Sequence, residues 1–456
     1  MPKLSRRNDL VRPSPTLAIT ARANALRAQG IDVVGFGAGE PDFDTPTRIC
    51  DAAVAALRAG FTRYTPEAGI PELRDAVAAR ATRTLGVPFA RENVAVTVGG
   101  KQGIYNFFQC VLDPGDEVLI PTPCWVSYPD QVALAGGRAV FVEGPAERSY
   151  VPSPEALAAA VTPRTRVLVI NSPSNPTGAV WSDRDLRAAA DLAARHDLWI
   201  LSDEIYDELV FSGPHRSVLH VAPEAVSRVC VANGASKTYA MTGWRVGWVV
   251  APPPLAQAIA VLTGQSVSAP TSFAQKGAVA ALTGPQDDVP RWRESFRARR
   301  DLAFDLCREV PGFEPFQPAG AFYLWIDVRP LLRSGPPAPT TSAELAARLL
   351  DEARVALVPG SAFYVEGFVR VSFATAPAKI EEGFRRIREF VARLGGGAAR
   401  ARSASSAPRT PRVAPRARPA RATGSRGRGA GPRGRSDRRG RTRRTRFARC
   451  RRWRRA

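Results

Sequence analysis

A lysine, an arginine and several small residues lie together in one short run of the chain. Lys237 stands in Gly-Ala-Ser-Lys-Thr-Tyr-Ala-Met-Thr-Gly-Trp-Arg-Val-Gly, with Ser236 before it and Arg245 eight positions after it. A lysine that forms a Schiff base with an aldehyde cofactor must be able to lose its proton, needs space for a flat ring, and needs a cation nearby for a phosphate. Lys237 and Arg245 could meet the first and third needs. A Ser-Lys pair alone is equally typical of a solvated surface lysine, so the rest of the chain must decide.

A carboxylate follows an apolar run at residues 199–201, in the sequence Ser-Asp-Glu-Ile-Tyr that contains Asp203 and Tyr206. Burying a carboxylate at a strand end costs free energy unless it is paired. Pairing with a protonated pyridine nitrogen would offset that cost and make the ring a better electron sink, and Tyr206 could donate to a ring oxygen. The alternative is that Asp203 simply caps the next helix.

Three further places after predicted strands carry suitable chemistry. Gly100, Lys101 and Gln102 open a helical pattern, where free N–H groups and the helix dipole favour a phosphate, although a plain glycine turn gives the same pattern. Trp125 could stack on a heteroaromatic ring or pack in the core. Asn175, in the turn Ser-Pro-Ser-Asn-Pro-Thr-Gly, could reach a phenolic oxygen or only make the turn.

Alternating strands and helices must position these residues. The predicted strands are short apolar runs between residues 94 and 250, at 94–98, 117–121, 139–143, 166–171, 199–203 and 228–232. Continuous apolar runs favour a mostly parallel sheet with helices on both faces. The run 244–250 follows too soon for a helical crossover, so we expect it to pair antiparallel. In such a sheet the ligand lies beyond the carboxyl ends of the strands, which is where the residues above are placed.

The remaining body of the chain is less regular and predicts an α+β domain. We expect a helix near 296–307, strands near 322–328, 353–358 and 368–373, and an amphipathic helix over 379–394. The segment before Pro46 is expected to pack with this domain. The prediction is therefore a large α/β domain of residues 46–285, a small discontinuous domain of residues 1–45 and 286–395, and a disordered Arg-rich tail of residues 396–456.

The tail accounts for nearly all of the charge. After residue 400 the chain has 21 Arg, no Lys and one Asp, which supplies +20 of the formal +22 and leaves about +2 for the rest. Low hydrophobicity with many Pro, Gly and Ser predicts disorder, and the charge would allow sequence-indifferent, salt-dependent binding of nucleic acid. A GC-rich reading frame translated out of register gives a similar arginine-saturated run. Both interpretations remain open.

Cysteine usage and hydropathy indicate the compartment. The six cysteines show no paired spacing and there are only three histidines, so we expect neither a disulfide framework nor a metal site. No run approaches the roughly 18 apolar residues of a membrane span, and the basic N-terminus has no apolar stretch after it. We expect a cytoplasmic protein without a membrane partner.

Five blocks together resemble one family, the class I aminotransferases of fold type I, which use pyridoxal 5′-phosphate. These blocks are Gly-Glu-Pro-Asp-Phe-Asp-Thr-Pro from Gly39, the turn with Asn175, the Asp203 block, the Lys237 block, and Arg-Val-Ser-Phe from Arg370. The similarity extends from about residue 4 to residue 394. It implies a large domain built on a mostly parallel seven-stranded sheet, and a smaller α+β domain.

The resemblance implies a role for each matching residue. Lys237 would hold the cofactor as a Schiff base and move the substrate proton, and Asp203 would pair with the ring nitrogen. The other cofactor contacts would be Trp125, Asn175 and Tyr206 at the ring, and Gly100, Lys101, Gln102, Ser236 and Arg245 at the phosphate. Gly234 stands where some members have a phosphate-binding serine, which removes one such contact. Tyr64 matches the tyrosine that reaches the neighbouring subunit's phosphate, which implies a homodimer with a shared active site.

The resemblance also implies a substrate. Arg370 would clamp the α-carboxylate with a two-pronged hydrogen bond, beside Gly39, Trp125 and Asn175. The bacterial aspartate aminotransferase branch meets a distal carboxylate at the positions of Lys101, Ser14 and Thr16, which favours L-aspartate and 2-oxoglutarate as the amino acid and 2-oxo acid substrates. A basic residue at the position of Arg12 accompanies prephenate transamination, which stays an alternative, as does a broader aromatic or aliphatic specificity. Elimination or C–S cleavage on the same scaffold is a further alternative. A nucleic-acid-binding regulator with an aminotransferase-like sensor domain would need a helix-turn-helix module ahead of that domain, and the roughly 30 residues before the family blocks are too few for one.

Overall fold

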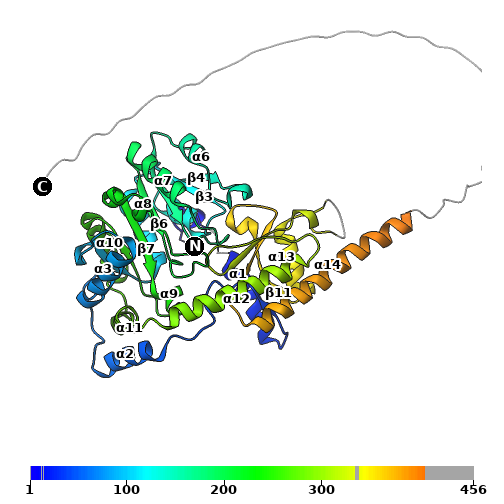
Figure 1. Cartoon of the computed structure of the whole chain (residues 1–456), viewed down its shortest axis with the longest axis horizontal. Coiled ribbons are helices and arrows are strands. Elements are labelled where there is room, and N and C mark those ends of the chain that lie inside the picture. The colour runs from blue at the N-terminus through cyan, green and yellow to red at the C-terminus, as the bar shows by residue number, and fades with distance from the viewer. Residues whose placement is uncertain (1, 12, 14, 334–337, 406–456) are drawn as a thin grey trace, which may run out of the picture. The chain divides into compact units, whose positions relative to one another are not determined.

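A seven-stranded sheet is the largest sheet in the part of the chain that the structure describes (Figure 1). The structure is a computed structural model that describes residues 2–11, 13, 15–333 and 338–405. The strands, in the spatial order β2-β8-β7-β6-β5-β3-β4, are β2 (Val94–Thr97), β3 (Glu117–Thr122), β4 (Arg138–Glu143), β5 (Thr165–Asn171), β6 (Trp199–Asp203), β7 (Val229–Gly234) and β8 (Gly247–Val250). Among these described strands, β8 alone runs in the opposite direction, so it pairs antiparallel with both β2 and β7, and the other pairs are parallel. The predicted mostly parallel sheet, with its one antiparallel strand, is confirmed.

Side chains from successive residues of these strands enter two separate cores, one on each face of the sheet. Ile200 and Leu201 of β6 show the alternation, because the first packs in one core and the second in the other. One face is covered by α2 (Thr47–Arg58), α3 (Pro71–Leu85), α6 (Pro154–Ala159), α7 (Asp183–Arg195), α8 (Val218–Val221) and α11 (Ser272–Thr283), and the other by α4 (Gly100–Val111), α5 (Ser127–Leu134) and α10 (Pro253–Val267). Burial on both faces explains why the strands are continuous apolar runs.

A second, antiparallel sheet has the strand order β12-β13-β10-β9 within the described residues. Its strands are β9 (Glu314–Phe316), β10 (Tyr323–Asp327), β12 (Val358–Pro359) and β13 (Phe368–Ser372). Beside it, β1 (Val34–Gly35) pairs in parallel with β11 (Val355–Ala356), so the N-terminal segment joins this region. The strand predicted at 353–358 is in fact two short strands in different sheets, because the chain changes partners at the buried Leu357.

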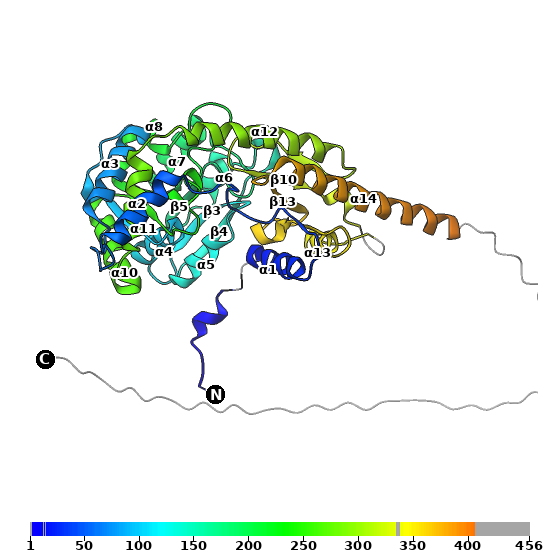
Figure 2. The ribbon, with the colours of Figure 1, turned by 90° about the horizontal axis from the view of Figure 1, so that it is seen from below.

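Four helices pack around these smaller sheets, namely α1 (Pro15–Ala28), α12 (Asp288–Arg308), α13 (Ser342–Glu352) and α14 (Pro377–Ser405). Helices α12 and α14 lie side by side (Figure 2). Helix α14 continues past Leu394 to Ser405, into the predicted tail, although its extension begins with three glycines, which have low helix propensity. Residues 406–456 lie outside the described residues. The domain boundaries at 45/46 and 285/286 stay a prediction.

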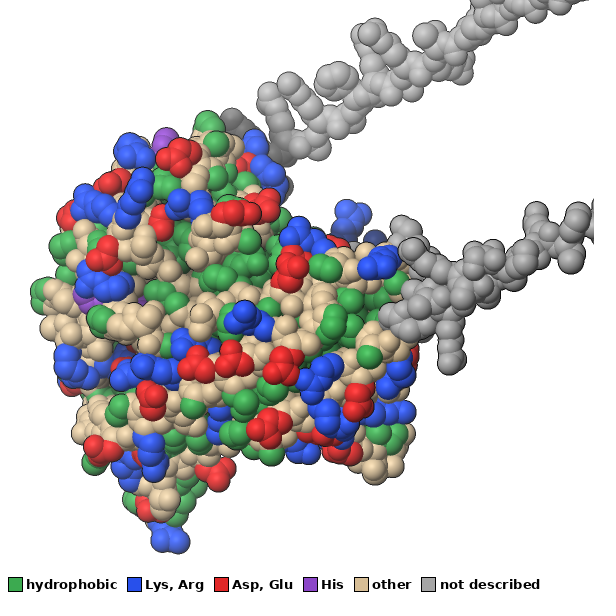
Figure 3. Space-filling model, turned by 45° about the vertical axis from the view of Figure 1, so that its right-hand side comes forward, with side chains coloured by type: hydrophobic (Ala, Val, Ile, Leu, Met, Phe, Trp, Pro, Cys, Tyr) green, Lys and Arg blue, Asp and Glu red, His purple; other side chains and the backbone are tan. Residues whose placement is uncertain are grey.

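The other described elements are short. They are the single-turn helix α9 (Ala235–Thr238) and the 3-10 helices η1 (Arg6–Asp9), η2 (Arg91–Asn93), η3 (Ala146–Arg148), η4 (Pro223–Arg228), η5 (Arg329–Leu331) and η6 (Gly360–Phe363). Basic and acidic side chains are interspersed on the face shown in Figure 3, which suits the near-neutral charge outside the tail. Within the described ranges, no helix combines the length and the apolar character needed to cross a bilayer.

Candidate active site

The carboxyl ends of three neighbouring strands bring the predicted cofactor residues together. β5 ends at Asn171, opposite Asp203 at the end of β6, and β7 leads directly into α9, which carries Lys237. The Asn171 side chain connects two of these ends, because its Nδ2 donates to the carbonyl of Asp203 at 3.1 Å and its Oδ1 accepts from the backbone N–H of Asn175 at 2.8 Å. Asn175, Asp203 and Lys237 therefore lie along one edge of the sheet, as the strand-end rule predicts.

The Lys237 amine is partly buried and has few polar neighbours. Its Nζ donates to the carbonyl of Gly39 at 2.5 Å and lies 5.9 Å from the ring centroid of Phe322. Burial lowers the pKa of Lys237 to about 8, since its opposing attraction to Glu40 is smaller than the desolvation of the charged form. An amine with this pKa can give up its proton close to neutral pH.

The carboxylate of Asp203 is buried, with a relative exposure of 5%. It accepts hydrogen bonds from the Tyr128 hydroxyl at 2.5 Å and from the backbone N–H of Ile205 at 3.3 Å. Burial raises the pKa of Asp203 to about 6 although both hydrogen bonds lower it. A buried carboxylate with spare acceptor capacity suits a cationic ring N–H.

Sequence reasoning missed Tyr128. The residue lies in α5, and its ring meets that of Trp125 edge-on with centroids 5.2 Å apart. The spacing of three between Trp125 and Tyr128 would place both on one helical face, which was an available signal. Its partner at Asp203 is 75 positions away and no local pattern identifies it.

The turn after β6 is fixed on its other side by Glu204, which is buried. Its carboxylate accepts from the hydroxyls of Ser202 at 2.7 Å and Ser217 at 2.6 Å, and lies 2.9 Å from Nε2 of His215. Asp203 and Glu204 therefore use opposite faces of the sheet, one toward the site and the other away from it.

Arg370 on β13 is buried at 3% exposure and has neutral hydrogen-bond partners. Its Nη1 donates to Oδ1 of Asn175 at 2.8 Å and its Nη2 donates to the carbonyl of Gly37 at 2.9 Å, while Nε has no partner. The guanidinium lies 4.3 Å from the ring centroid of Tyr323. No carboxylate of the described residues forms an ion pair with Arg370, so this buried cation retains N–H groups for an anion.

Tyr206 and Gly39 line the same corner as Arg370. The Tyr206 and Tyr323 hydroxyls are 2.8 Å apart, and both side chains are buried. A Cβ at Gly39 would lie 2.9 Å from the Tyr323 hydroxyl, so a larger residue there would displace that ring. Gly39 is thus required by close approach and not only by a turn.

The start of α4 forms a second corner, suited to a phosphate. Gly99 has φ 76°, which favours glycine, and a Cβ there would lie 2.6 Å from Nη2 of Arg245. Arg245 also has a left-handed backbone, φ 57°, and its Nη1 donates to the carbonyl of Thr242 at 2.8 Å. An exposed cation beside a helix N-terminus is a favourable place for a phosphate.

The other predicted residues of this corner differ in what their side chains do. Oε1 of Gln102 accepts from the backbone N–H of Val98 at 2.6 Å and its Nε2 donates to the Ser266 hydroxyl at 3.4 Å, so this side chain holds the glycine turn. The Lys101 amine lies 5.2 Å from the ring centroid of Trp125. Burial lowers the pKa of Lys101, and Arg245 lowers it further. Ser236 is buried in α9 directly before Lys237.

The structure gives the four other predicted residues no contact with these two corners, or does not describe them. Tyr64 is 92% exposed, which fits a residue that would act in another subunit. Thr16 lies in α1, where its carbonyl accepts from the Thr20 hydroxyl at 3.0 Å. Arg12 and Ser14 lie outside the described residues.

Enzymes that bind a cofactor through a lysine at the carboxyl edge of a parallel sheet form several families, and comparison with known proteins selects one of them. The chain belongs to the aminotransferase class I and II family, whose model matches residues 31–387. It is 44% identical over 390 residues to an aspartate aminotransferase of Geobacillus stearothermophilus, covering 85% of this chain and 99% of that protein. It is 46% identical over 398 residues to an aspartate/prephenate aminotransferase of Thermus thermophilus, covering 87% and 99%.

Solved structures agree with this assignment. The Thermus thermophilus aspartate aminotransferase with maleate superposes with a TM-score of 0.81 at 44% identity, covering 85% of this chain and 100% of that chain. The aspartate aminotransferase of Rhizobium meliloti gives 0.82 at 39% identity, covering 86% and 100%. The predicted family and fold are confirmed.

The cofactor of this enzyme is pyridoxal 5′-phosphate, as in other aminotransferases of this type. The residues present fit three parts of this cofactor, namely its aldehyde, its ring nitrogen and its phosphate. Lys237 offers an amine of lowered pKa for the aldehyde, Asp203 a buried carboxylate for the ring nitrogen, and the α4 start with Arg245 a cationic corner for the phosphate. The protein is therefore a pyridoxal-phosphate-dependent transaminase.

Proposed function

We propose that this enzyme moves the amino group of L-aspartate to 2-oxoglutarate, giving oxaloacetate and L-glutamate. The observation that carries the proposal is the buried Arg370, which has neutral partners and an unpartnered Nε. A buried guanidinium in this state is most stable with a carboxylate, which its planar fork can bind through two N–H groups. The names of the Geobacillus and Thermus relatives support aspartate as the substrate that carries this carboxylate.

Each side chain then has a defined task in the reaction. Bound pyridoxal phosphate supplies an aldehyde for the substrate amine and an electron-withdrawing ring. Lys237 would take the proton from the substrate Cα and deliver it to the aldehyde carbon of the cofactor, since its pKa of about 8 lets the amine act as a base near neutral pH. Asp203 would hold a proton at the ring nitrogen, and Asn175 and Tyr206 would contact the ring oxygen. Arg370 orients the α-carboxylate beside Gly39.

The remaining cofactor contacts would come from Trp125 and from the corner at the start of α4. Trp125 would contact the ring. The phosphate would be held by the backbone of Gly100, Lys101 and Gln102 together with Ser236 and Arg245. This division assigns Gln102 a backbone role, because its side-chain oxygen is bonded to Val98 and its side-chain nitrogen to Ser266.

Lys101 is the residue that we assign to the distal carboxylate. Its amine lies over the ring of Trp125, the same ring that we place against the cofactor, so the cation is at the edge of the substrate position. Thr16 and Ser14 from the N-terminal segment would add hydroxyl donors. An enzyme that selects apolar side chains would leave a partly desolvated cation there without a partner.

A substrate panel on the purified enzyme tests this proposal. L-Aspartate with 2-oxoglutarate should give a higher kcat/KM than L-alanine or aromatic amino acids. Lys101→Ala should raise the aspartate KM while leaving the alanine KM unchanged, because only aspartate has a second carboxylate. Equal effects on both substrates, or faster turnover of alanine or aromatic substrates by the parent, would contradict aspartate specificity.

Prephenate transamination is the second candidate. The Thermus relative is named for both activities, and Arg12 stands where a basic residue accompanies prephenate use. Arg12→Ala should reduce kcat/KM for prephenate more than for aspartate if prephenate is also a substrate. An unchanged ratio would contradict a role of Arg12 in recognising prephenate.

We also propose a homodimer in which Tyr64 completes the phosphate site of the partner subunit. The 92% exposure of its side chain supports this, because an exposed phenol can reach a second subunit. A cytoplasmic location belongs to the same proposal, and it is supported by the free state of the cysteines at 50, 110, 124, 230 and 307, the described ones.

A further inference from the structure

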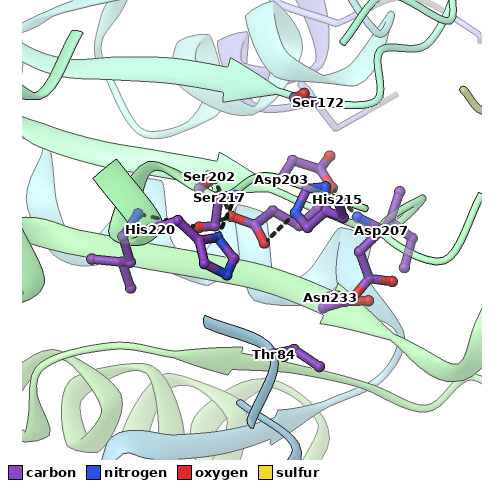
Figure 4. Close-up of polar contacts among 12 residues, drawn as sticks. Thr84, Ser172, Ser202, Asp203, Asp207, His215, Ser217, His220 and Asn233 are labelled. Atoms are coloured by element: carbon purple, nitrogen blue, oxygen red, sulfur yellow. Dashed lines mark hydrogen bonds and ion pairs between the residues drawn. The ribbon is translucent and has the colours of Figure 1, made fainter. Parts of the chain in front are cut away.

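One buried carboxylate connects the two strand ends that carry the reacting groups. Asp207 lies in the turn after β6, four positions after Asp203, and is 8% exposed. Its Oδ2 accepts from Nη2 of Arg80 at 2.7 Å and from Nδ2 of Asn233 at 2.8 Å. Figure 4 shows Asp207 facing Asn233 across the neighbouring strand ends. The site described above makes no use of either residue.

Asn233 extends this hydrogen-bonded connection toward Lys237. It is the last residue but one of β7, and its Oδ1 accepts from the backbone N–H of Gly234 at 2.7 Å. Gly234 leads into α9, which carries Ser236 and Lys237. Hydrogen bonds therefore run from the turn that holds Asp203 to the peptide that leads to Lys237.

Asn233 also lies beneath the phosphate corner. Its carbonyl oxygen is 3.4 Å from the position of a Cβ on Gly100, the first residue of α4. A shift of Asn233 would thus move the entry to α9 and the floor of the α4 start together. Both are proposed contacts of the cofactor.

The charge pair that holds Asp207 is a poor source of stability by itself. Arg80 comes from α3, and its side chain is as buried as that of Asp207, at 8% and 7% exposure. Desolvation of two such charges commonly cancels their attraction, so apolar side chains of similar size would stabilise the fold as well. What the pair offers, and apolar residues cannot, is a fixed acceptor for Asn233.

We propose that Asp207 is a positioning residue, which through Asn233 and Gly234 sets the distance between Lys237 and Asp203, with Arg80 as its counter-charge. The inference rests on the proposed roles of Lys237 and Asp203 at the cofactor. Without the connection, α9 is free to shift against β6. Displacements of about 1 Å at reacting groups can cost about 100-fold in rate.

The test uses Asn233→Ala in the holoenzyme, because this change cuts the connection and leaves the pair of Arg80 and Asp207 in place. The matched control is Glu208→Gln, which alters the other partner of Arg80, at 3.3 Å, without touching β7. The readouts are the dissociation constant of pyridoxal phosphate by absorbance titration, the pH midpoint of the bound cofactor's absorbance, the unfolding temperature and kcat.

We expect Asn233→Ala to weaken cofactor binding by about tenfold or more, to move the absorbance midpoint, and to lower kcat by up to about 100-fold. Its unfolding temperature should stay close to that of the parent. Glu208→Gln should match the parent in all four measurements. Asp207→Asn should retain much of the cofactor binding, because an amide oxygen still accepts from Asn233.

A second variant keeps the test decisive if Asn233→Ala does not fold. Arg80→Met/Asp207→Leu removes both charges at once, so no unpaired charge is left buried, and it should reproduce the loss of cofactor affinity and the moved midpoint. Parent-like binding and an unchanged midpoint in the folded variants would overturn the inference. A parent enzyme that binds no pyridoxal phosphate would instead refute the proposed function.

Discussion

Replacing Arg370 with lysine should weaken recognition of the substrate carboxylate by an amount that the structure allows us to calculate. The guanidinium has five N–H groups, of which one is used by Asn175 and one by Gly37. Three remain, enough for a two-pronged bond. A lysine ammonium has three N–H groups, and the same two neighbours leave one for the substrate. Arg370→Lys therefore loses one charge-assisted hydrogen bond while keeping the charge.

Such a bond contributes about 1.5–3 kcal/mol, which corresponds to a fall in kcat/KM of about 10- to 150-fold for aspartate. Steady-state kinetics gives this ratio, and the dissociation constant of maleate, a dicarboxylate that does not react, separates binding from chemistry. Cofactor absorbance and unfolding temperature should remain near those of the parent. A change below threefold in both kcat/KM and maleate binding would refute the assignment of Arg370 to the carboxylate.

Three other changes test different parts of the structure. Lys237→Ala should abolish turnover, and in the cofactor-free parent the amine should become reactive toward an acylating reagent as the pH rises through about 8, a step that the variant lacks. Glu117 has fully buried side-chain atoms and bonds to Arg138 and Arg164, and the bond to Arg138 is the main reason that its pKa falls to about 2. This carboxylate stabilises the fold above pH 4.5 and loses the effect as the pH falls toward 2. Because both arginines are largely exposed, Glu117→Gln should cost about 1–2 kcal/mol at pH 7 and progressively less in acid, as urea unfolding will show. If the active site is shared, mixing inactive Lys237→Ala and Tyr64→Ala subunits should restore about a quarter of parental activity, because half of the dimers then contain one intact site; no recovery on subunit exchange would contradict the shared site.

The sequence alone located the residues whose position depends on local chain order. Asn175, Asp203 and Lys237 each follow an apolar strand, and parallel strands end at the same edge, so their meeting could be deduced. The same reasoning placed Gly100 at a helix start and β8 antiparallel. In each case a short stretch of chain contains the whole signal.

The partners of these residues could not be deduced in the same way. Tyr128 reaches Asp203 across 75 positions, and Arg370 reaches Asn175 across 195. The first contact depends on how α5 packs on the large sheet and the second on how the two sheets pack, which no hydropathy pattern specifies. The same limit explains the division of residues 353–358 between two sheets, because both halves are equally apolar and only the neighbours β1 and β13 differ.

The left-handed backbone of Arg245 has an evolutionary consequence. A non-glycine residue at φ 57° is strained by roughly 1–2 kcal/mol, which glycine would relieve. Selection of a mutant library for heat resistance alone should therefore enrich Arg245→Gly, and the survivors should require more vitamin B6 in the medium. At this position thermal stability therefore favours glycine, whereas cofactor binding favours arginine.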